Sequence, residues 1–232
     1  MLYHIQMPQL IEATLVRRLN RFVAEIMISE NHELAHVPSS GRMAELLVGG
    51  RRIWVSRHPG EGHKTTYRLL LVEHEGILVS VDATLPNRLV GRALMAEALP
   101  AFSPYPRVQA EFSWGHSRFD FHLSGPPGEC LLEVKSVTLV DKGVALFPDA
   151  PTPRGTRHLV ELATARRKGL QGAIIFVAQR EDASCFSPNH RQDSAFAKAL
   201  QQAAASGVKV LAYRCRVTRE AVTLEHEIPV LL

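Results

Sequence analysis

Three residues near the middle of the chain have the types and the spacing that a metal-assisted reaction needs. Asp120 lies in one run of alternating polar and apolar residues, and Glu133 and Lys135 lie in the next such run. Two carboxylates held together suit an oxygen-preferring divalent cation, Mg²⁺ or Mn²⁺, which binds carboxylates and keeps several waters. A lysine ammonium beside them could orient a metal-bound water or stabilise developing negative charge.

The loop between the two runs predicts how these residues meet. Residues 124–129 read Ser-Gly-Pro-Pro-Gly-Glu, which is turn chemistry because proline presets φ and glycine tolerates positive φ. Two alternating runs joined by such a loop predict an antiparallel hairpin. If its dyad falls at the centre of the loop, Asp120 lies directly opposite Glu133, and Phe121 lies opposite Leu132.

Side chains alternate between the two faces of a strand, so the hairpin should have one apolar and one polar face. The apolar face would carry Phe119, Phe121, Leu132 and Val134, and the polar face Arg118, Asp120, His122, Glu133 and Lys135. Carboxylates directly opposite each other repel, which favours a cation between them. The alternative is a solvated face on which the arginine and the lysine neutralise the two carboxylates. A one-residue slip in register would also move the aspartate to the other face.

Several long strings of the sequence resemble a known family. An aspartate, a hairpin and Glu-x-Lys form the pattern of the PD-(D/E)xK nuclease superfamily. More specifically, the strings at residues 117–121 (SRFDF), 133–140 (EVKSVTLV), 143–150 (GVALFPDA) and 154–159 (RGTRHL) are similar to the bacterial sugar fermentation stimulation protein family. With weaker similarity around Gly41-Arg42-Met43, the resemblance covers nearly the whole chain.

This resemblance implies a two-domain fold. An OB-like β-barrel would occupy residues 1–83, and a restriction-endonuclease-like mixed-sheet α/β domain residues 84–232. The family is regarded as DNA-binding, so the resemblance implies a DNA-binding protein involved in regulating sugar-utilisation genes, with Asp120, Glu133 and Lys135 in the nuclease positions. Two alternatives stay open: a Mg²⁺-dependent nuclease that hydrolyses DNA phosphodiesters, and an interaction protein with a relic nuclease site.

Composition narrows the class of protein. Apolar residues make up 46% of the 232 residues, yet no apolar stretch approaches the length that spans a bilayer. The N-terminus lacks the apolar core of a secretory signal. The three cysteines, Cys130, Cys185 and Cys215, are widely spaced and odd in number, which argues against a disulfide framework or a zinc site. We therefore expect a cytoplasmic protein without membrane partners.

The charge permits a polyanionic partner. The net charge is +4, and its excess lies wholly in residues 84–232, because residues 1–83 hold nine basic and nine acidic residues. The candidate DNA contacts are Arg42, Arg51, Arg52, Arg57, Lys64, Arg68, Arg154 and Arg157. No helix-turn-helix recognition helix is apparent, so binding through phosphates with little sequence preference is expected.

The pattern along the first third predicts the barrel. Strands are expected at residues 10–17, 21–28, 32–37, 51–57, 65–74 and 77–82, with a short helix at 42–48. Short strands with one helix after the third suggest an OB-type barrel. Phe22, Trp54 and Tyr67 could stack on bases, although aromatic residues of a small barrel are more often part of its core.

The remainder predicts an α/β domain. Helices are expected at residues 87–99, 155–168 and 193–205, and strands at 108–112, in the hairpin, at 172–179, at 208–217 and, as an edge strand, in the tail 221–232. Glu97 could add a carboxylate to the metal site, although a surface charge is the simpler interpretation. His158 could act as an acid or base, with a structural histidine as the alternative. Arg154 and Arg157 lie where a helix N-terminus favours phosphate.

Overall fold

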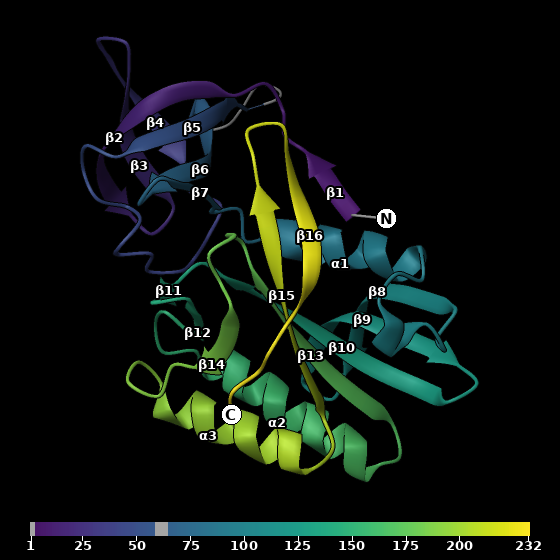
Figure 1. The fold of residues 1–232 in the computed structure, drawn as a ribbon. Helices are drawn as coiled ribbons and strands as arrows, with labels where there is room; N and C mark the ends of the chain where they lie inside the picture. Colours follow the sequence, from purple (N-terminus) through teal and green to yellow (C-terminus); the bar gives the residue numbers. More distant parts are fainter. Residues whose placement is uncertain (1–2, 59–64) are drawn as a thin grey trace.

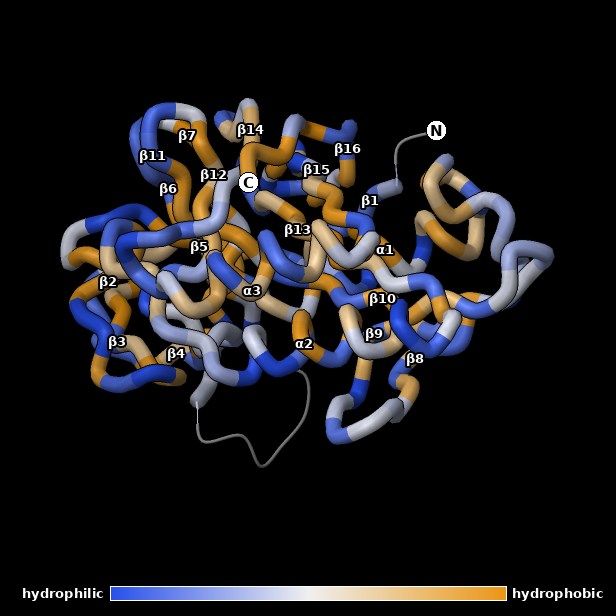
Figure 2. The backbone as a smooth tube through the Cα atoms, turned by 90° about the horizontal axis from the view of Figure 1, so that it is seen from below, coloured by the Kyte–Doolittle hydropathy of each residue, from blue (hydrophilic) through white to orange (hydrophobic). Residues whose placement is uncertain are grey.

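The computed structural model describes residues 3–58 and 65–232. It consists of a small closed barrel that leads into a larger mixed sheet with helices on both faces (Figure 1). This is the predicted fold class. Apolar stretches follow the strands of both parts, while the peripheral loops are largely hydrophilic (Figure 2).

Five strands close the barrel. They are β2 (Ile11–Asn20), β3 (Val23–Ile28), β4 (Asn31–His36), β5 (Arg52–Arg57) and β6 (Tyr67–His74). The antiparallel order β4-β3-β2-β5-β6 is closed by a parallel pairing of β4 with β6, and β7 (Ile77–Ser80) adds a hairpin to β6. Closure removes the exposed strand edges, and the inward-facing residues Leu15, Ile26, Ile53 and Leu69 are fully buried.

The helix predicted at residues 42–48 is wrong, because this segment forms only turns. Met43 has a positive φ of 46°, and its carbonyl accepts the N–H groups of both Leu46 and Leu47. Met43 and Leu46 are buried in the barrel core. Their apolar side chains therefore fill part of the barrel core from an irregular turn. The spacing of apolar residues in such a turn resembles that of a short helix.

The larger sheet has seven strands in the order β1-β16-β15-β13-β10-β9-β8. Their bounds are β1 (Tyr3–Gln6), β8 (Arg107–Trp114), β9 (Ser117–Gly125), β10 (Gly128–Val137), β13 (Gln171–Ala178), β15 (Lys209–Val217) and β16 (Ala221–Ile228). The pairs β10–β13 and β13–β15 are parallel, and the other neighbours are antiparallel. The edge position predicted for the tail is wrong, because β16 is paired on both sides.

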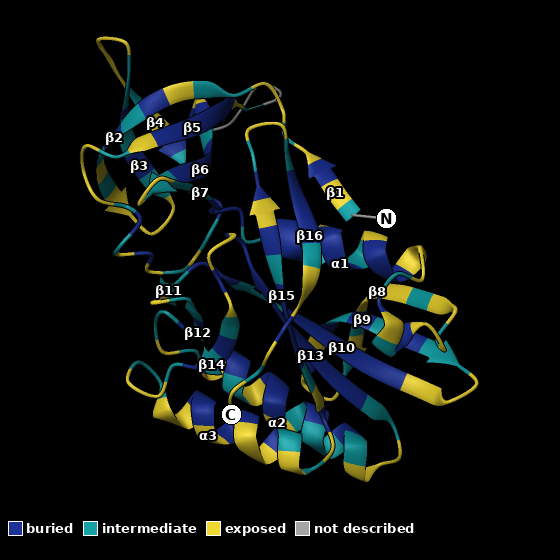
Figure 3. Ribbon diagram, viewed as in Figure 1, coloured by how far each residue is buried: buried dark blue, intermediate teal, exposed yellow. Residues whose placement is uncertain are grey.

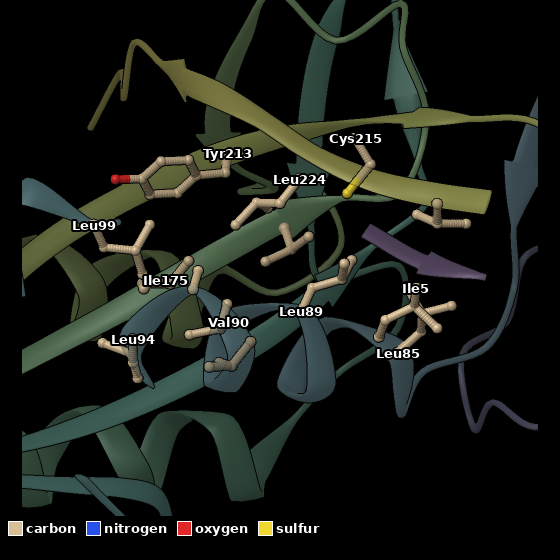
Figure 4. Packing of buried hydrophobic residues seen from close by; sticks show 14 of the residues in the cluster. Ile5, Leu85, Leu89, Val90, Leu94, Leu99, Ile175, Tyr213, Cys215 and Leu224 are labelled. Carbon is tan, nitrogen blue, oxygen red and sulfur yellow. The ribbon is translucent and has the colours of Figure 1, made fainter. Parts of the chain in front are cut away.

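Helices cover both faces of this sheet. α1 (Leu85–Met95) packs on one face, whereas α2 (Pro153–Arg167) and α3 (Ser194–Ala205) pack on the other, and a 3₁₀ turn, Pro100–Phe102, follows α1. Alternate residues of β13 serve the two cores: Ile175 lies with α1 (Figure 4), and Phe176 lies with α2 and α3. β13 is buried along almost its whole length (Figure 3), as its continuous apolar run predicts.

A small second sheet was not predicted. It joins β11 (Val140–Asp141), β12 (Val144–Phe147) and β14 (Cys185–Pro188), and it lies beside the barrel (Figure 1). The parallel pairing of β12 with β14 joins segments about forty residues apart, as in Ala145 opposite Phe186. Strands this short have little sequence periodicity of their own, so whether they form depends on pairing with a segment far away in the sequence.

That residues 1–83 and 84–232 fold as two independent units stays a prediction. The first strand nevertheless belongs to the larger sheet, since Tyr3 and Ile5 pair with Leu224 and Val222 of β16. Across the junction, the Gln179 side chain donates to the Asp82 carbonyl at 3.1 Å. In the described part of the chain, no helix is both long and apolar enough to cross a bilayer.

A second contact across the junction involves Asp149. Its Oδ2 accepts the backbone N–H of Met43 at 2.9 Å, and Gly41 passes so close that a Cβ there would lie 2.8 Å from the same oxygen. The chain therefore needs glycine at position 41 to bring the barrel segment against the carboxylate. This contact joins residues 106 positions apart.

We predict that Asp149→Ala lowers the free energy of unfolding by about 1–3 kcal/mol, because it leaves the buried Met43 N–H without its hydrogen-bond acceptor. Asp149→Asn, which keeps an oxygen acceptor, should retain most of the stability. Urea unfolding of the full chain measures both, with the exposed Asp141→Ala as control. Equal stabilities for Asp149→Ala and Asp141→Ala would contradict this role.

Candidate active site

A cavity of about 460 Å³ lies at the junction of the barrel and the larger sheet. Asp120, Glu133 and Lys135, the predicted catalytic group, all line it. The barrel part of the chain contributes Arg21, Ser39, Ser40 and Gly41 to its lining, and α2 contributes Arg154. The three predicted residues thus share one cavity with cationic side chains from both parts of the chain.

The hairpin register agrees with the sequence-based prediction. Phe121 pairs with Leu132, and the pairing continues through Leu123 and Cys130 toward the turn. Beyond Phe121 the two backbones no longer pair, and the Asp120 carboxylate enters the space between the strands. Its Oδ2 accepts the backbone N–H of Val134 at 2.7 Å. The aspartate is therefore fixed by the neighbouring strand itself.

The predicted polar face of the hairpin is wrong. β10 lies between β9 and β13 and is buried on both faces, so Glu133 is only 3% exposed. Phe119 and Phe121 do not share a core either, because Phe119 packs with α2 and α3 whereas Phe121 packs with α1. Arg118 is exposed and pairs with Glu111 at 3.5 Å instead of neutralising Asp120. Alternation within one hairpin does not reveal that a third strand and two helices cover it.

Glu133 is held on one oxygen and free on the other. Lys135 Nζ donates to Oε1 at 2.5 Å, and His158 Nδ1 lies 2.6 Å from the same atom, close but poorly aligned for a hydrogen bond. Burial alone would raise the pKa of Glu133, but His158 and Lys135 outweigh it and lower that pKa. Oε2 is buried in the cavity wall with no hydrogen-bond partner among the described residues.

Asp120 has the opposite electrostatic character. Asn87 Nδ2 donates to its Oδ1 at 2.5 Å, in addition to the Val134 N–H on Oδ2. Burial and the negative charge of Glu133 nevertheless raise the pKa of Asp120 to about 6. Two neighbouring carboxylates with shifted pKa values in one cavity are typical of a functional site.

The donor set fits Mg²⁺ or Mn²⁺ and does not fit zinc. Within residues 3–58 and 65–232, no cluster of three or more His, Cys, Asp or Glu side chains is arranged to hold a metal. Mg²⁺ commonly uses one or two carboxylates and completes its shell with water and substrate phosphate. The unpartnered Glu133 Oε2 and the raised pKa of Asp120 are both features that a cation between the carboxylates would relieve.

Around the carboxylates, Glu97 and His158 follow the simpler interpretations, a surface charge and a structural histidine, whereas Asn87 was missed. Glu97 is exposed just beyond the end of α1 and has no place in the cavity. The same helix instead contributes Asn87, near its N-terminus, which carried no signal beyond its place after Pro86. His158 is 1% exposed and contacts Glu133, and the Arg154 Nε donates to its Nε2 at 3.5 Å. Nε2 thus faces the Arg154 donor, and Nδ1 faces Glu133 Oε1.

The candidate DNA contacts fall into separate groups. Arg154 lines the cavity, while Arg157 and Arg42 are exposed. Three barrel arginines are engaged within the chain: Arg51 donates to the Glu45 carbonyl, Arg52 lies near Glu12 and Glu73, and Arg68 binds Asp82 at 2.8 Å. Arg57 lies over the Tyr67 ring. Lys64 lies outside the described residues, and Arg21, which lines the cavity, was missed.

The aromatic residues of the barrel differ in exposure. Trp54 is 4% exposed and Tyr67 is 6% exposed, so both belong to the core, as the alternative interpretation expected. Phe22 is 47% exposed at the turn between β2 and β3. Of these three aromatic residues, Phe22 is the one whose ring is free to contact a ligand broadly.

Fold and cavity together define a two-domain protein in which an OB-type barrel precedes a mixed-sheet α/β domain, with a carboxylate pair at their junction. Family models agree in both parts: the SfsA N-terminal OB domain matches residues 16–81, and the sugar fermentation stimulation protein RE domain matches residues 84–221. The chain belongs to the sugar fermentation stimulation protein family.

Individual relatives match over nearly their full lengths. A sugar fermentation stimulation protein homolog of Desulforamulus reducens is 48% identical over 228 residues, covering 98% of this chain and 95% of the relative. A homolog of Chloroflexus aggregans is 45% identical over 223 residues, covering 96% and 86%. The solved structure of Pyrococcus furiosus SfsA in complex with Ca²⁺ superposes with a TM-score of 0.92 at 29% identity over all of both chains.

The raised pKa of Asp120 predicts a pH-dependent cost in the metal-free protein. Because the folded state holds this proton more tightly than the unfolded state, wild-type stability falls as the pH rises from about 4 through about 6. The shift from 3.8 to about 6 corresponds to at most about 3 kcal/mol.

In Asp120→Asn this cost should disappear. If Asn87 reverses its amide, the new side chain can accept from Val134 and donate to Asn87. Urea unfolding in EDTA should give a stability difference, variant minus wild type, that grows between pH 4 and 6 and then levels. A difference that is constant from pH 4 to 7 would contradict the raised pKa.

Proposed function

We propose that this protein is a metal-dependent nuclease that uses Asp120, Glu133 and Lys135 to hydrolyse phosphodiester bonds of nucleic acid. The observation that carries the proposal is the gathering of these side chains in one cavity with Arg21 and Arg154. Carboxylates alone would repel a phosphodiester, so their joint presence with cationic side chains favours a metal-bridged phosphate.

Asp120 and Glu133 would hold the cation, Mg²⁺ or Mn²⁺. Both oxygens of Asp120 already accept hydrogen bonds, which fixes the direction of its carboxylate, while Glu133 Oε2 is unengaged by the described residues. A bound cation supplies Lewis-acid polarisation of a phosphoryl oxygen and lowers the pKa of a water. The Pyrococcus furiosus relative was solved in complex with Ca²⁺, a cation that prefers the same oxygen ligands.

The side chains of this site divide the remaining work. Lys135, anchored on Glu133 Oε1, places its ammonium where it can hold the attacking water or the developing negative charge. His158 lies behind Glu133 and orients that carboxylate from the buried side, so it is a positioning residue. Arg154 and Arg21 line the cavity and are suited to bind the phosphates on either side of the reacting bond.

Substitution of the three residues should separate binding from chemistry. Asp120→Ala or Glu133→Ala should abolish the heat of Mg²⁺ and Mn²⁺ binding in calorimetric titration, because each removes one of two carboxylate ligands. Lys135→Ala should retain the metal and lose cleavage by a factor of about 10² or more, since it removes a charge-stabilising donor.

Glu129→Gln is the matched control, because that carboxylate lies on the same strand but is 59% exposed and outside the cavity. It should leave both metal binding and cleavage unchanged. No metal heat in the wild type, or cleavage that survives Glu133→Ala, would refute the nuclease and leave a protein with a relic site.

A second candidate is a DNA-binding regulator of sugar-utilisation genes. It is favoured by the names of the relatives, which refer to stimulation of sugar fermentation. Both candidates require contacts with DNA phosphates. The basic side chains of the cavity, Arg21 and Arg154, come from the barrel and α2, and neither belongs to a helix-turn-helix motif among the described residues.

We therefore predict binding with little sequence preference and an affinity whose logarithm falls linearly with the logarithm of the salt concentration. Arg154→Ala should reduce the magnitude of that slope by roughly 0.7–0.9, the loss of one phosphate contact. Arg52→Ala should leave it unchanged, because Glu12 and Glu73 already surround that guanidinium. Fluorescence anisotropy at several salt concentrations measures the slopes. A salt-independent affinity would refute phosphate-led binding.

A further inference from the structure

We propose that the strand entering the cavity is single-stranded nucleic acid, and that the barrel presents Phe22 and His36 as a stacking platform for its bases. This inference rests on the proposed function and names its substrate class. It is carried by an exposed aromatic surface of the barrel and by Arg21, which precedes Phe22 in the chain and lines the cavity.

The platform consists of rings from two neighbouring segments of the barrel. The Phe22 and His36 rings are stacked, with centroids 6.4 Å apart and planes within 22°. His58 extends the set, with its centroid 6.0 Å from that of His36. Phe22 is 47% exposed, so part of its side chain is open to solvent. Every base has a π face, so flat rings of this kind bind bases with little regard to sequence.

The platform is held in place before any ligand arrives. His36 Nδ1 donates to the Phe22 carbonyl at 3.1 Å, which the Val37 N–H also binds at 2.8 Å. The Phe22 N–H in turn donates to Asn20 Oδ1 at 2.9 Å. These bonds fix the Phe22 backbone and the His36 ring, so the platform loses less conformational entropy on binding, which is the usual benefit of preorganisation.

Arg18 connects the platform to the cavity. Its guanidinium donates to the carbonyls of Asn20, Arg21 and Arg42 at 3.1, 2.6 and 2.5 Å. The next residue after Arg42 is Met43, whose N–H binds Asp149 of the cavity wall. The turn that carries Phe22 is thereby connected, through backbone carbonyls and the Asp149 carboxylate, to the lining of the cavity.

Arg21 stands at the point where the two surfaces meet. It precedes Phe22 in the chain, and it lines the cavity that contains Asp120 and Glu133. A phosphate bound by Arg21 would therefore lie between a base on the Phe22 ring and a phosphodiester at the carboxylates. Alternation of cation and ring along one path is the pattern of single-strand binding grooves.

The cavity accommodates a single strand more readily than a duplex. At about 460 Å³ it lies in the size range of small-ligand pockets, and it is partly open to solvent. Because residues of both the barrel and α2 line it, a nucleotide that has left a base pair would reach the carboxylates more readily than a paired one. A base in the interior of a duplex is also stacked on both sides and offers no free face to the Phe22 ring.

The test uses the cleavage-deficient background Asp120→Asn, so that binding is measured whether or not the protein hydrolyses anything. The probes are a fluorescein-labelled dT oligomer of about ten nucleotides and a blunt duplex of the same length, within the site sizes of single-strand binding folds. The single strand should bind more tightly than the duplex. Adding Phe22→Ala should weaken single-strand binding about tenfold or more, as expected for loss of one stacking partner.

Matched variants separate stacking from folding. Val160→Ala changes a side chain of similar exposure, 54%, on α2, and should leave the affinity unchanged. Phe22→Trp should restore binding, and its fluorescence should be quenched by the oligomer, a signal that a structural role would not produce. Thermal unfolding should show that all variants remain folded.

Two results would overturn the inference: equal affinity for the duplex and the single strand, or a Phe22→Ala affinity equal to that of Val160→Ala. Absence of hydrolysis by the wild type in Mg²⁺ or Mn²⁺ would instead refute the proposed nuclease and leave the binding result intact. The two failures are therefore distinguishable.

Discussion

The site depends on one electrostatic constraint, which is the burial of two carboxylates side by side. Like charges in a medium of low dielectric repel strongly. The surrounding residues offset this repulsion differently for Glu133 and for Asp120. Glu133 has a lysine and a histidine against one oxygen, whereas Asp120 has only neutral donors, Asn87 and the Val134 N–H, among the described residues. The residual charge on the Asp120 side is where a cation would be most strongly stabilised.

The cavity around this pair exists because the barrel is fixed against the larger sheet. Asp149, the close approach of Gly41 and the Arg18 guanidinium together connect the turn of Arg21 and Phe22 to the carboxylate wall. The first strand, β1, strengthens the same arrangement, since it leaves the barrel sequence to pair with β16. A barrel that was only tethered would present its basic and aromatic residues without a defined direction.

The distribution of arginines shows why charge alone is a poor guide to the ligand surface. Arg52 and Arg68 are matched by carboxylates within the barrel, so they serve the fold. Arg21 and Arg154, from parts of the chain more than a hundred residues apart, line the same cavity. What distinguishes them is that they line the cavity that holds Asp120 and Glu133, a property that no count of basic residues contains.

The sequence by itself determined the local features of this protein. Alternation and turn chemistry determined the hairpin, and with it the Phe121–Leu132 register; the closing strands of the barrel and the buried strand β13 followed from the same signals. These depend on neighbours along the chain and on backbone sterics. Tertiary structure alone decided the burial of β10, the pairing of β12 with β14, and the partners Asn87, His158 and Asp149. Those depend on contacts between segments far apart in sequence, such as Asp149 and Met43, which are 106 positions apart, and short-range periodicity carries no information about them.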